Sequence, residues 1–456
     1  MRQARSRNFL WAAAFFCLST GVRADDVDRY VQAQMQREHI PGLSLAIVRN
    51  GRIEKLRGYG FADVERKVPA TADTVYEIGS ITKQFTSMAV MLLVERGRLG
   101  LDDPIGKFLT RIPEAWRART IRQILSHTSG IPDYEEVMGY DQYRNPMTPE
   151  QVFALVASRP LDFDPGTRWK YSNTGYYLLT LLIEKLSGES YTSFVSRNIL
   201  APAGMSLTRS SEPSDVIANR AAGYVYAAGL RNRDAIQPSA TGGAGMLVST
   251  VGDMVRWASF IAKRALLKPE SYAAMFADVR LGDGTATGYG FGWFVAPMRN
   301  RPSLSHSGET PGFTANFLHL PDDGVTIIAL QNSGNANPFN LTDHLARVLV
   351  PALRYTVISD PRPEVAALVR DFYAHRIDPE PHVAALSAEL AAQVTPYWSS
   401  NVDYYRALGT PTAVELVEQR GERSFRYRVR YRELSRLVAI SLDETGKIGD
   451  MSGSEE

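Results

Sequence analysis

Ser80 and Lys83 stand three residues apart, at the start of a run whose apolar residues, such as Phe85 and Leu92, recur at helical spacing. Residues three apart are neighbours on a helix surface, so the lysine is expected beside the serine hydroxyl. A serine is a poor nucleophile until a neighbouring base removes its proton. Backbone N–H groups at the helix start would also favour negative charge nearby. The pair therefore indicates a nucleophilic serine, although chance alone gives about 0.7 such motifs in a chain of this kind.

Two later motifs strengthen this interpretation. Tyr171-Ser172-Asn173 follows a glycine-containing turn, and His306-Ser307-Gly308 precedes a strand-like run. With Ser80-Ile81-Thr82-Lys83, they resemble the serine β-lactamase and penicillin-binding superfamily, whose S-x-x-K, Y-x-N or S-x-N, and K-T-G or H-x-G elements occur in this order. The tyrosine form resembles the class C β-lactamase branch, which includes carboxypeptidases, D-aminopeptidases and esterases. The resemblance spans about residues 27–355, and residues 79–86, 125–132 and 242–246 also look like this family.

The resemblance implies a role for each motif residue. Ser80 would attack a carbonyl while Lys83 and Tyr171 handle its proton, and Asn173 would bind the substrate or hold Lys83. A free tyrosine has a pKa near 10, so Tyr171 would need positive neighbours to act as a base. His306, Ser307 and Gly308 would line the substrate site. The resemblance also implies an oxyanion hole formed by the backbone N–H groups of Ser80 and Glu309.

His306 is the departure that bears on the substrate. Where a lysine would supply a fixed positive charge, an imidazole is mostly neutral at pH 7. Attraction for a substrate carboxylate is then weaker, which favours peptidase or esterase activity over an efficient β-lactamase. Two roles remain open for His306. It could hold a carboxylate when protonated, or it could be a neutral hydrogen-bonding member of its strand.

The first 24 residues are typical of a secretory signal peptide, with Arg2, Arg5 and Arg7 before an apolar run and a small-x-small ending at Ala24. The apolar run is shorter than the ~20 residues that span a bilayer. The only cysteine, Cys17, lies inside this segment, so the mature chain is expected to lack disulfides and thiol nucleophiles. We expect an exported protein, periplasmic or secreted, with no integral membrane span in the mature chain.

Charge and motifs exclude several classes of function. Lys and Arg fall from 51 to 47 without the signal peptide, against 49 Asp and Glu, so the mature chain carries a net charge near −2. This balance gives no argument for nucleic acid binding. The seven histidines have no H-E-x-x-H spacing, and G-x-S-x-G is absent, which argues against a metal hydrolase and an α/β-hydrolase. We expect no metal or other cofactor.

The order of apolar and turn segments predicts the architecture. Strands are expected at 43–48 and 52–64, joined by the Asn50-Gly51 hairpin turn, and again at 290–295, 312–320 and 325–331. The segment 101–222 is helical and loop-rich. We therefore expect an α/β fold, in which helices flank an antiparallel sheet made of the two chain ends and an all-helical subdomain is inserted, as in the β-lactamase/transpeptidase-like fold. The expected division is signal peptide 1–24, catalytic domain 25–359, and a small α+β accessory domain 361–456 after the Pro-flanked linker 360–363.

Several other residues have ordinary structural explanations. His127 is expected to bond local backbone in its turn, Lys170 to be solvated, and Gly242–Gly245 to form a tight turn or to approach a ligand. In the strand 424–432, Arg426, Arg428, Arg430 and Arg432 alternate with apolar residues. A solvated face explains this row better than contact with an anionic polymer.

The sequence thus predicts a serine acyl hydrolase that acts on a peptide or other small molecule, cell-wall fragments among the candidates. D-amino-acid peptides, esters and β-lactams remain open as substrates. The alternative is a catalytically inactive scaffold or binding protein of the bacterial envelope. Truncation after Ser359 is expected to spare the site, because every assigned catalytic residue lies upstream.

Overall fold

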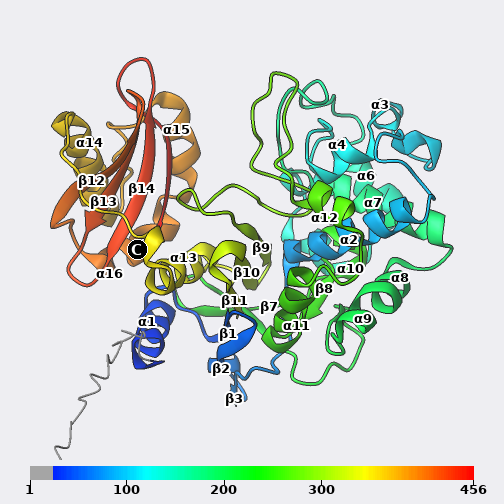
Figure 1. Ribbon diagram of the computed structural model, residues 1–456. Helices are drawn as coiled ribbons and strands as arrows, with labels where there is room; N and C mark the ends of the chain where they lie inside the picture. Colours follow the sequence, from blue (N-terminus) through cyan, green and yellow to red (C-terminus); the bar gives the residue numbers. More distant parts are fainter. Residues whose placement is uncertain (1–23) are drawn as a thin grey trace, which may run out of the picture.

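The computed structural model describes residues 24–456 (Figure 1). The expected signal peptide lies outside the described residues except for Ala24, the first residue of helix α1 (Ala24–Arg37). Within the described range, no helix combines the length and the apolar character needed to cross a membrane.

A six-stranded antiparallel sheet unites the two ends of the main region, residues 24–359. Its order is β3-β2-β1-β11-β10-β9. The strands are β1 (Gly42–Arg49), β2 (Arg52–Asp63), β3 (Val68–Pro69), β9 (Leu304–Thr310), β10 (Phe313–Leu320) and β11 (Val325–Gln331). The register pairs Leu43 with Gln331, so β1 lies directly beside a strand almost 290 residues away. The antiparallel sheet expected from the two chain ends is confirmed, and Asn50 and Gly51 form the β1–β2 turn with positive φ.

Alternation along the strands gives the sheet two apolar faces. Leu43, Leu45 and Ile47 belong to a core cluster with residues of α1 and of α13 (Pro338–Leu349). Ala46 and Ile328 point to the other face, where the core includes residues of α2 (Thr82–Glu95) and α11 (Val251–Ala262). This second core carries α2, and with it the serine and lysine of the first motif.

The inserted part is mainly helical, as expected. Its helices are α3 (Glu114–Arg117), α4 (Ile121–Leu125), α5 (Tyr140–Arg144), α6 (Pro149–Ala154), α7 (Asn173–Ser187), α8 (Tyr191–Val195), α9 (Ala201–Ala203), α10 (Pro238–Thr241) and α12 (Pro269–Phe276). Its short strands are β4 (Tyr76–Glu77), β5 (Arg209–Ser210), β6 (Gly223–Tyr226), β7 (Leu230–Arg233) and β8 (Leu247–Ser249). The strand expected at 290–295 is wrong: only Phe294 bridges the sheet, to Ser305, and Gly292 takes φ +77°, which interrupts extended backbone.

The C-terminal region, residues 361–456, has its own sheet and core. Helices α14 (Pro363–Ala374), α15 (Ala388–Val394) and α16 (Val402–Leu408) pack with strands β12 (Ala413–Arg420), β13 (Ser424–Arg430), β14 (Ser435–Leu442) and β15 (Ile448–Glu455). The strands form a sheet in the order β12-β13-β14-β15. Val369, Trp398 and Tyr427 are fully or almost fully buried in its core.

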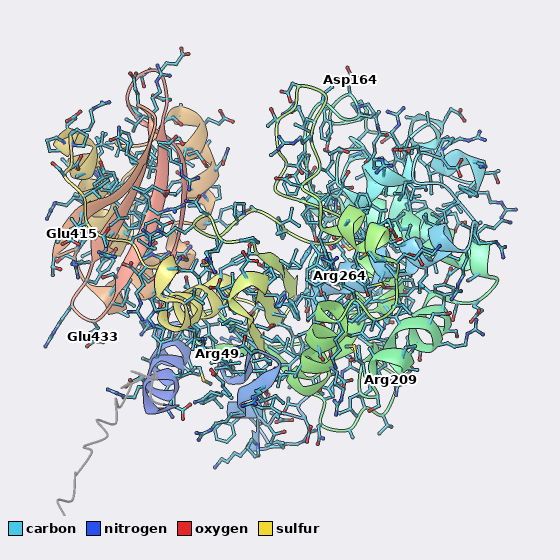
Figure 2. All side chains as sticks on the ribbon, viewed as in Figure 1. Arg49, Asp164, Arg209, Arg264, Glu415 and Glu433 are labelled. Carbon is cyan, nitrogen blue, oxygen red and sulfur yellow. The ribbon has the colours of Figure 1, made fainter. Side chains whose placement is uncertain are left out.

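The arginines of β13 correct one expectation. Arg428 is only 11% exposed and donates to the carboxylate of Glu456 and the carbonyl of Tyr355. Arg426 is partly buried and bonds Glu418. Arg430 and Arg432 are exposed as expected, and Arg430 pairs with Glu415 of β12, which is labelled in Figure 2. A solvated arginine row is therefore wrong for Arg426 and Arg428, because this face of the sheet turns toward the main region.

Candidate active site

Ser80 lies in a short 3₁₀ turn, Gly79–Ile81, that leads directly into α2. Gly79 and Ile81 are buried, whereas Ser80 keeps some exposure. The residues of α2 from Thr82 to Leu93 are buried on all sides, so the helix is not the amphipathic surface element that its spacing suggested. The serine thus reaches solvent from a rigid, deeply anchored support.

Lys83 faces Ser80 from the first turn of α2. Its Nζ lies 3.0 Å from Ser80 Oγ and also donates to Asn173 Oδ1 at 2.7 Å and to the carbonyl of Ala244 at 2.8 Å. Burial lowers the pKa of Lys83 to about 7, although the carboxyls of Glu135 and Asp133 act to raise it. A fully buried lysine with such a pKa can be neutral near physiological pH and can then accept a proton.

Asn173 connects this lysine to a buried carboxyl. It begins α7, and its Nδ2 donates to Asp133 Oδ2 at 3.0 Å while its backbone N–H donates to Asp133 Oδ1 at 3.1 Å. Because Asp133 holds the Nδ2 end of the Asn173 side chain, the other end, Oδ1, is oriented toward Lys83. The geometry places Asn173 as the residue that holds the lysine.

Tyr171 completes the group of side chains around Ser80. It hydrogen-bonds Ser80, and burial raises its pKa well above the usual value. Lys83 Nζ lies 4.7 Å from the centre of the Tyr171 ring. With a raised pKa, the phenol is neutral at pH 7, so Lys83 is the better candidate to accept the proton of Ser80 and Tyr171 a group that donates or relays one.

Strand β9 approaches the serine turn so closely that glycine is needed on both sides. A Cβ at Gly308 would lie 1.9 Å from the carbonyl oxygen of Ile78 and 3.1 Å from the backbone nitrogen of Ser80. A Cβ at Gly79 would lie 2.6 Å from the backbone nitrogen of Glu309. The backbone nitrogens of Ser80 and Glu309 therefore lie on facing segments, an arrangement suited to an oxyanion hole.

His306 belongs to this strand and is buried. Its Nε2 pairs with the hydroxyl of Tyr289 at 2.9 Å and its Nδ1 with the carbonyl of Ser307 at 2.6 Å. Burial, with the charge of Lys83, lowers the pKa of His306 to about 3. The imidazole is neutral at physiological pH and only 1% exposed, which favours the hydrogen-bonding role over the carboxylate-binding role.

The remaining residues singled out in the sequence are structural. His127 accepts the backbone N–H of Ser172 on Nδ1 at 3.1 Å, which fixes the loop of the second motif. Lys170 forms ion pairs with Glu136 and Asp162. A Cβ at Gly243 would lie 2.7 Å from Thr86 Oγ1, so Gly242–Gly245 is a tightly packed turn that presents the carbonyl of Ala244 to Lys83.

Sequence motifs did not reveal the acidic side chains of the site. Asp133 and Glu135 flank Tyr134 in the loop after α4, and both act on Lys83. Burial, with the charge of Asp133, raises the pKa of Glu135 to about 7, although Lys83 acts to lower it. Burial also raises the pKa of Glu309. The sequence signal for these residues was the pair Asp133 and Glu135, which begins six residues after His127. Only the fold shows that this pair lies beside Lys83.

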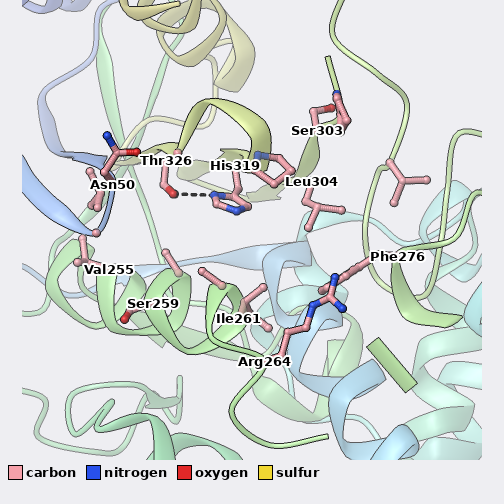
Figure 3. Close-up of a pocket in the computed structure, with 18 residues that line it drawn as sticks. Asn50, Val255, Ser259, Ile261, Arg264, Phe276, Ser303, Leu304, His319 and Thr326 are labelled. Atoms are coloured by element: carbon pink, nitrogen blue, oxygen red, sulfur yellow. Dashed lines mark hydrogen bonds between the residues drawn. The ribbon is translucent and has the colours of Figure 1, made fainter. Parts of the chain in front are cut away.

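Two other features lie apart from the serine. A cavity of about 500 Å³ between α11 and the sheet has a mostly apolar wall, with His319 Nδ1 2.8 Å from Thr326 Oγ1 (Figure 3). In the C-terminal region, Asp371, His375 and His382 bring three possible metal-ligand atoms within 4.8 Å of one another. The two imidazoles stack with their centres 3.9 Å apart. None of these residues is among those that surround Ser80.

Comparison with known proteins identifies the family. Residues 27–352 match the Beta-lactamase family, and the chain belongs to it. Penicillin-binding protein 4* of Bacillus subtilis is 32% identical over 298 residues, which cover 60% of this chain and 64% of that protein.

Two solved structures extend the comparison. The structure of D-amino acid amidase from Ochrobactrum anthropi SV3, complexed with L-phenylalanine amide, is 26% identical and covers 72% of this chain and 98% of its own, with a TM-score of 0.63. The octameric penicillin-binding protein homologue from Pyrococcus abyssi has 24% identity and a TM-score of 0.65. It covers 95% of this chain and 96% of its own, so its fold resemblance includes the C-terminal region. The family, penicillin-binding protein 4* and the D-amino acid amidase support serine hydrolase-type activity.

Proposed function

We propose that this chain is an exported serine acyl hydrolase that works through an acyl-enzyme on Ser80. The observation that carries the proposal is the 3.0 Å contact between Lys83 Nζ and Ser80 Oγ, made by a lysine whose pKa burial lowers to about 7. In this scheme residues 25–359 form the catalytic domain and residues 361–456 an accessory domain.

The reaction follows from the positions of the proton carriers. Neutral Lys83 takes the proton of Ser80 as Oγ bonds to the substrate carbonyl carbon, and the backbone N–H groups of Ser80 and Glu309 stabilise the oxyanion. The bond to the leaving group then breaks, and Tyr171 supplies the proton that the departing amine or alcohol needs, with Lys83 restoring it. Water attacks the ester in the same manner and releases the acid and free Ser80.

The charges around the serine favour a substrate with a free amino group. Asp133 and Glu135 place two carboxyls near Lys83, Glu309 lies near Glu135, and His306 is neutral. A substrate carboxylate would meet like charges there, whereas an ammonium group would be attracted. D-aminoacyl amides and peptides therefore rank above β-lactams and C-terminal carboxylates as substrates, in keeping with the amidase among the related structures.

A matched pair of substrates tests this ranking. The enzyme should hydrolyse a D-phenylalanine amide faster than its N-acetyl derivative, which differs only in lacking the charge. Glu135→Gln should raise KM for the free amide about tenfold to a hundredfold, since hydrogen bonds to charged groups contribute about 1.5–3 kcal/mol. Equal turnover of the two amides would reject the preference and leave the serine mechanism standing.

An acylating probe separates the enzyme from an inactive scaffold. A phosphonate that mimics an acyl donor should add the mass of one attached probe to the peptide carrying Ser80. Ser80→Ala should abolish both labelling and turnover. Absence of labelling in a folded protein, or labelling at another serine, would instead support a catalytically inactive binding protein.

A further inference from the structure

A second cavity, of about 360 Å³, lies between the main region and the C-terminal region. Its wall is formed by the 297–299 loop, α13, Tyr355 and strands of the C-terminal sheet. The wall contains four arginines: Arg299, Arg347, Arg420 and Arg426. In Figure 1, α13 lies beside the C-terminal sheet, so the cavity sits where the two regions meet.

Tyr355 holds two of these arginines in place. The guanidinium of Arg299 lies 4.6 Å from the centre of its ring and that of Arg426 lies 5.0 Å from it. Arg426 also donates to the Tyr355 hydroxyl. Stacking on an aromatic ring orients a guanidinium while leaving its N–H edge free to donate. Arg299 comes from the main region and Arg426 from β13, so their shared ring joins the two sides of the cavity.

Positive charge exceeds negative charge in this wall. Asp343 is the acidic side chain in the lining, and Glu418 adjoins it through its pairs with Arg420 and Arg426. Arg299 donates to the carbonyl of Ala352 and makes no ion pair with any residue of the described range. Two carboxyls thus face four guanidiniums. Burial lowers the pKa of Arg426, and the charges of Arg347 and Arg299 lower it further, as expected for crowded cations.

Arg347 offers a donor that the protein does not use. Its side chain is only 9% exposed; Nη1 donates to the carbonyl of Glu455 at 2.7 Å and Nη2 to Ser454 Oγ at 3.1 Å. Its Nε is buried and has no hydrogen-bond partner among the described residues. A buried donor without a partner costs free energy, which an acceptor in the cavity would recover.

From these observations we propose that the cavity binds an anion of phosphate chemistry carrying two or more negative charges, and that this anion joins the two regions. Guanidinium groups match phosphate oxygens in pairs, and four of them converge here with the hydroxyls of Ser452 and Ser454 beside them. The volume accommodates a pyrophosphate or a phosphodiester segment. The inference is independent of the chemistry at Ser80.

Isothermal titration calorimetry on the full chain at fixed ionic strength tests the site. Pyrophosphate should bind the wild type, and Arg299→Gln and Arg420→Gln should each weaken binding about tenfold to a hundredfold. Both arginines are at least partly exposed, so these variants should fold, which a circular dichroism melt verifies. Arg430→Gln is the matched control, because it removes the same charge from β13 outside the cavity and should bind as the wild type does.

Measurements with other probes identify the source of the anion. A soluble phosphodiester that binds as tightly as pyrophosphate would identify a polymer backbone, whereas binding of pyrophosphate alone would identify a free phosphate compound. Sodium chloride at matched ionic strength should leave the melting temperature unchanged while pyrophosphate raises it. No binding of either phosphate probe, or equal affinity in Arg299→Gln and the wild type, would overturn the proposal.

Discussion

Gly308 approaches Ser80 so closely that a single methyl group on its Cα would lie 3.1 Å from the serine backbone nitrogen. The same methyl would collide with the carbonyl oxygen of Ile78 at 1.9 Å. Neither contact can be relieved by rotating a side chain, because both partners are backbone atoms. The spacing between β9 and the serine turn, and with it the proposed oxyanion hole, therefore depends on the absence of a side chain at residue 308.

Gly308→Ala should lower kcat/KM by about 10²–10³, the range associated with loss of one oxyanion donor. Steady-state kinetics on a p-nitrophenyl ester would measure the loss. Gly100→Ala is the control, because a Cβ there would meet only ordinary contacts of 3.5 Å or more. Wild-type activity in folded Gly308→Ala would contradict the placement of the oxyanion hole.

Lys83 and Tyr171 should behave as one proton-handling unit. Each of Lys83→Ala and Tyr171→Phe should lower kcat/KM by about 10²–10⁴. Because both contact Ser80, the double variant should lose far less than the product of the two single losses. Lys170→Ala, which removes an ion-paired lysine beside Tyr171, should retain near wild-type kinetics. Multiplicative losses would show that the two residues act independently.

The motif residues were the part of the site that sequence could predict. Ser80, Lys83, Tyr171 and Asn173 are brought together as their order implied, and the antiparallel sheet with its helical insertion is confirmed. Asp133 and Glu135 were missed, because nothing in a short acidic loop indicates which side chains it will meet after folding. The sequence leaves both roles open for His306, because its protonation depends on burial and on the nearby charge of Lys83.

The C-terminal region was harder to predict for a different reason. Strand β15 is rich in glycine, serine and charged residues, so it has no apolar alternation that would indicate a strand. It is extended because it pairs with β14, with Arg436 opposite Glu455, and packs beside α13. Arg426 and Arg428 are likewise buried because the main region lies against them. The residue pattern within β13 does not indicate this contact.

The pH dependence of activity should report the neighbouring pair Lys83 and Glu135. Lys83 must be neutral to accept a proton, so kcat/KM on a neutral ester should rise with pH through about 7. Glu135→Gln removes a negative charge that raises the pKa of Lys83, so the rise should move to lower pH. Because the groups are coupled, the midpoint belongs to the pair.

Glu136→Gln provides the matched control for that profile. Glu136 neighbours Glu135 but is exposed and pairs with Arg159 and Lys170. Its removal should leave the midpoint where the wild type has it. A profile that is flat between pH 6 and 8, or identical in Glu135→Gln and the wild type, would exclude Lys83 as the titrating base.

Glu455 should determine how firmly the C-terminal region is attached. Its fully buried carboxylate accepts hydrogen bonds from Arg37 Nη2 at 2.6 Å, Tyr30 at 2.6 Å and Tyr404 at 2.8 Å, which joins α1 to α16. Removing one partner of a buried ion pair typically costs about 3–5 kcal/mol. Glu455→Gln should therefore lower Tm at pH 7. Truncation after Ser359 should also destabilise the main region, because Arg37 loses the Glu455 carboxylate and Arg347 loses the Glu455 carbonyl and the Ser454 hydroxyl.

The pH dependence separates this charge effect from a packing defect. Burial acts to raise the pKa of Glu455, but Arg37 and the tyrosine hydroxyls hold it below its usual value. A depressed carboxyl pKa stabilises the fold above the unfolded value, near 4.5, and the stabilisation is lost as pH falls through the folded pKa. Calorimetry should thus find wild type and Glu455→Gln far apart in Tm at pH 7 and converging below about pH 4. Glu433→Gln, at an exposed position (Figure 2), should match the wild type throughout. A Tm difference that persists undiminished at low pH would assign the effect to packing instead of the ion pair.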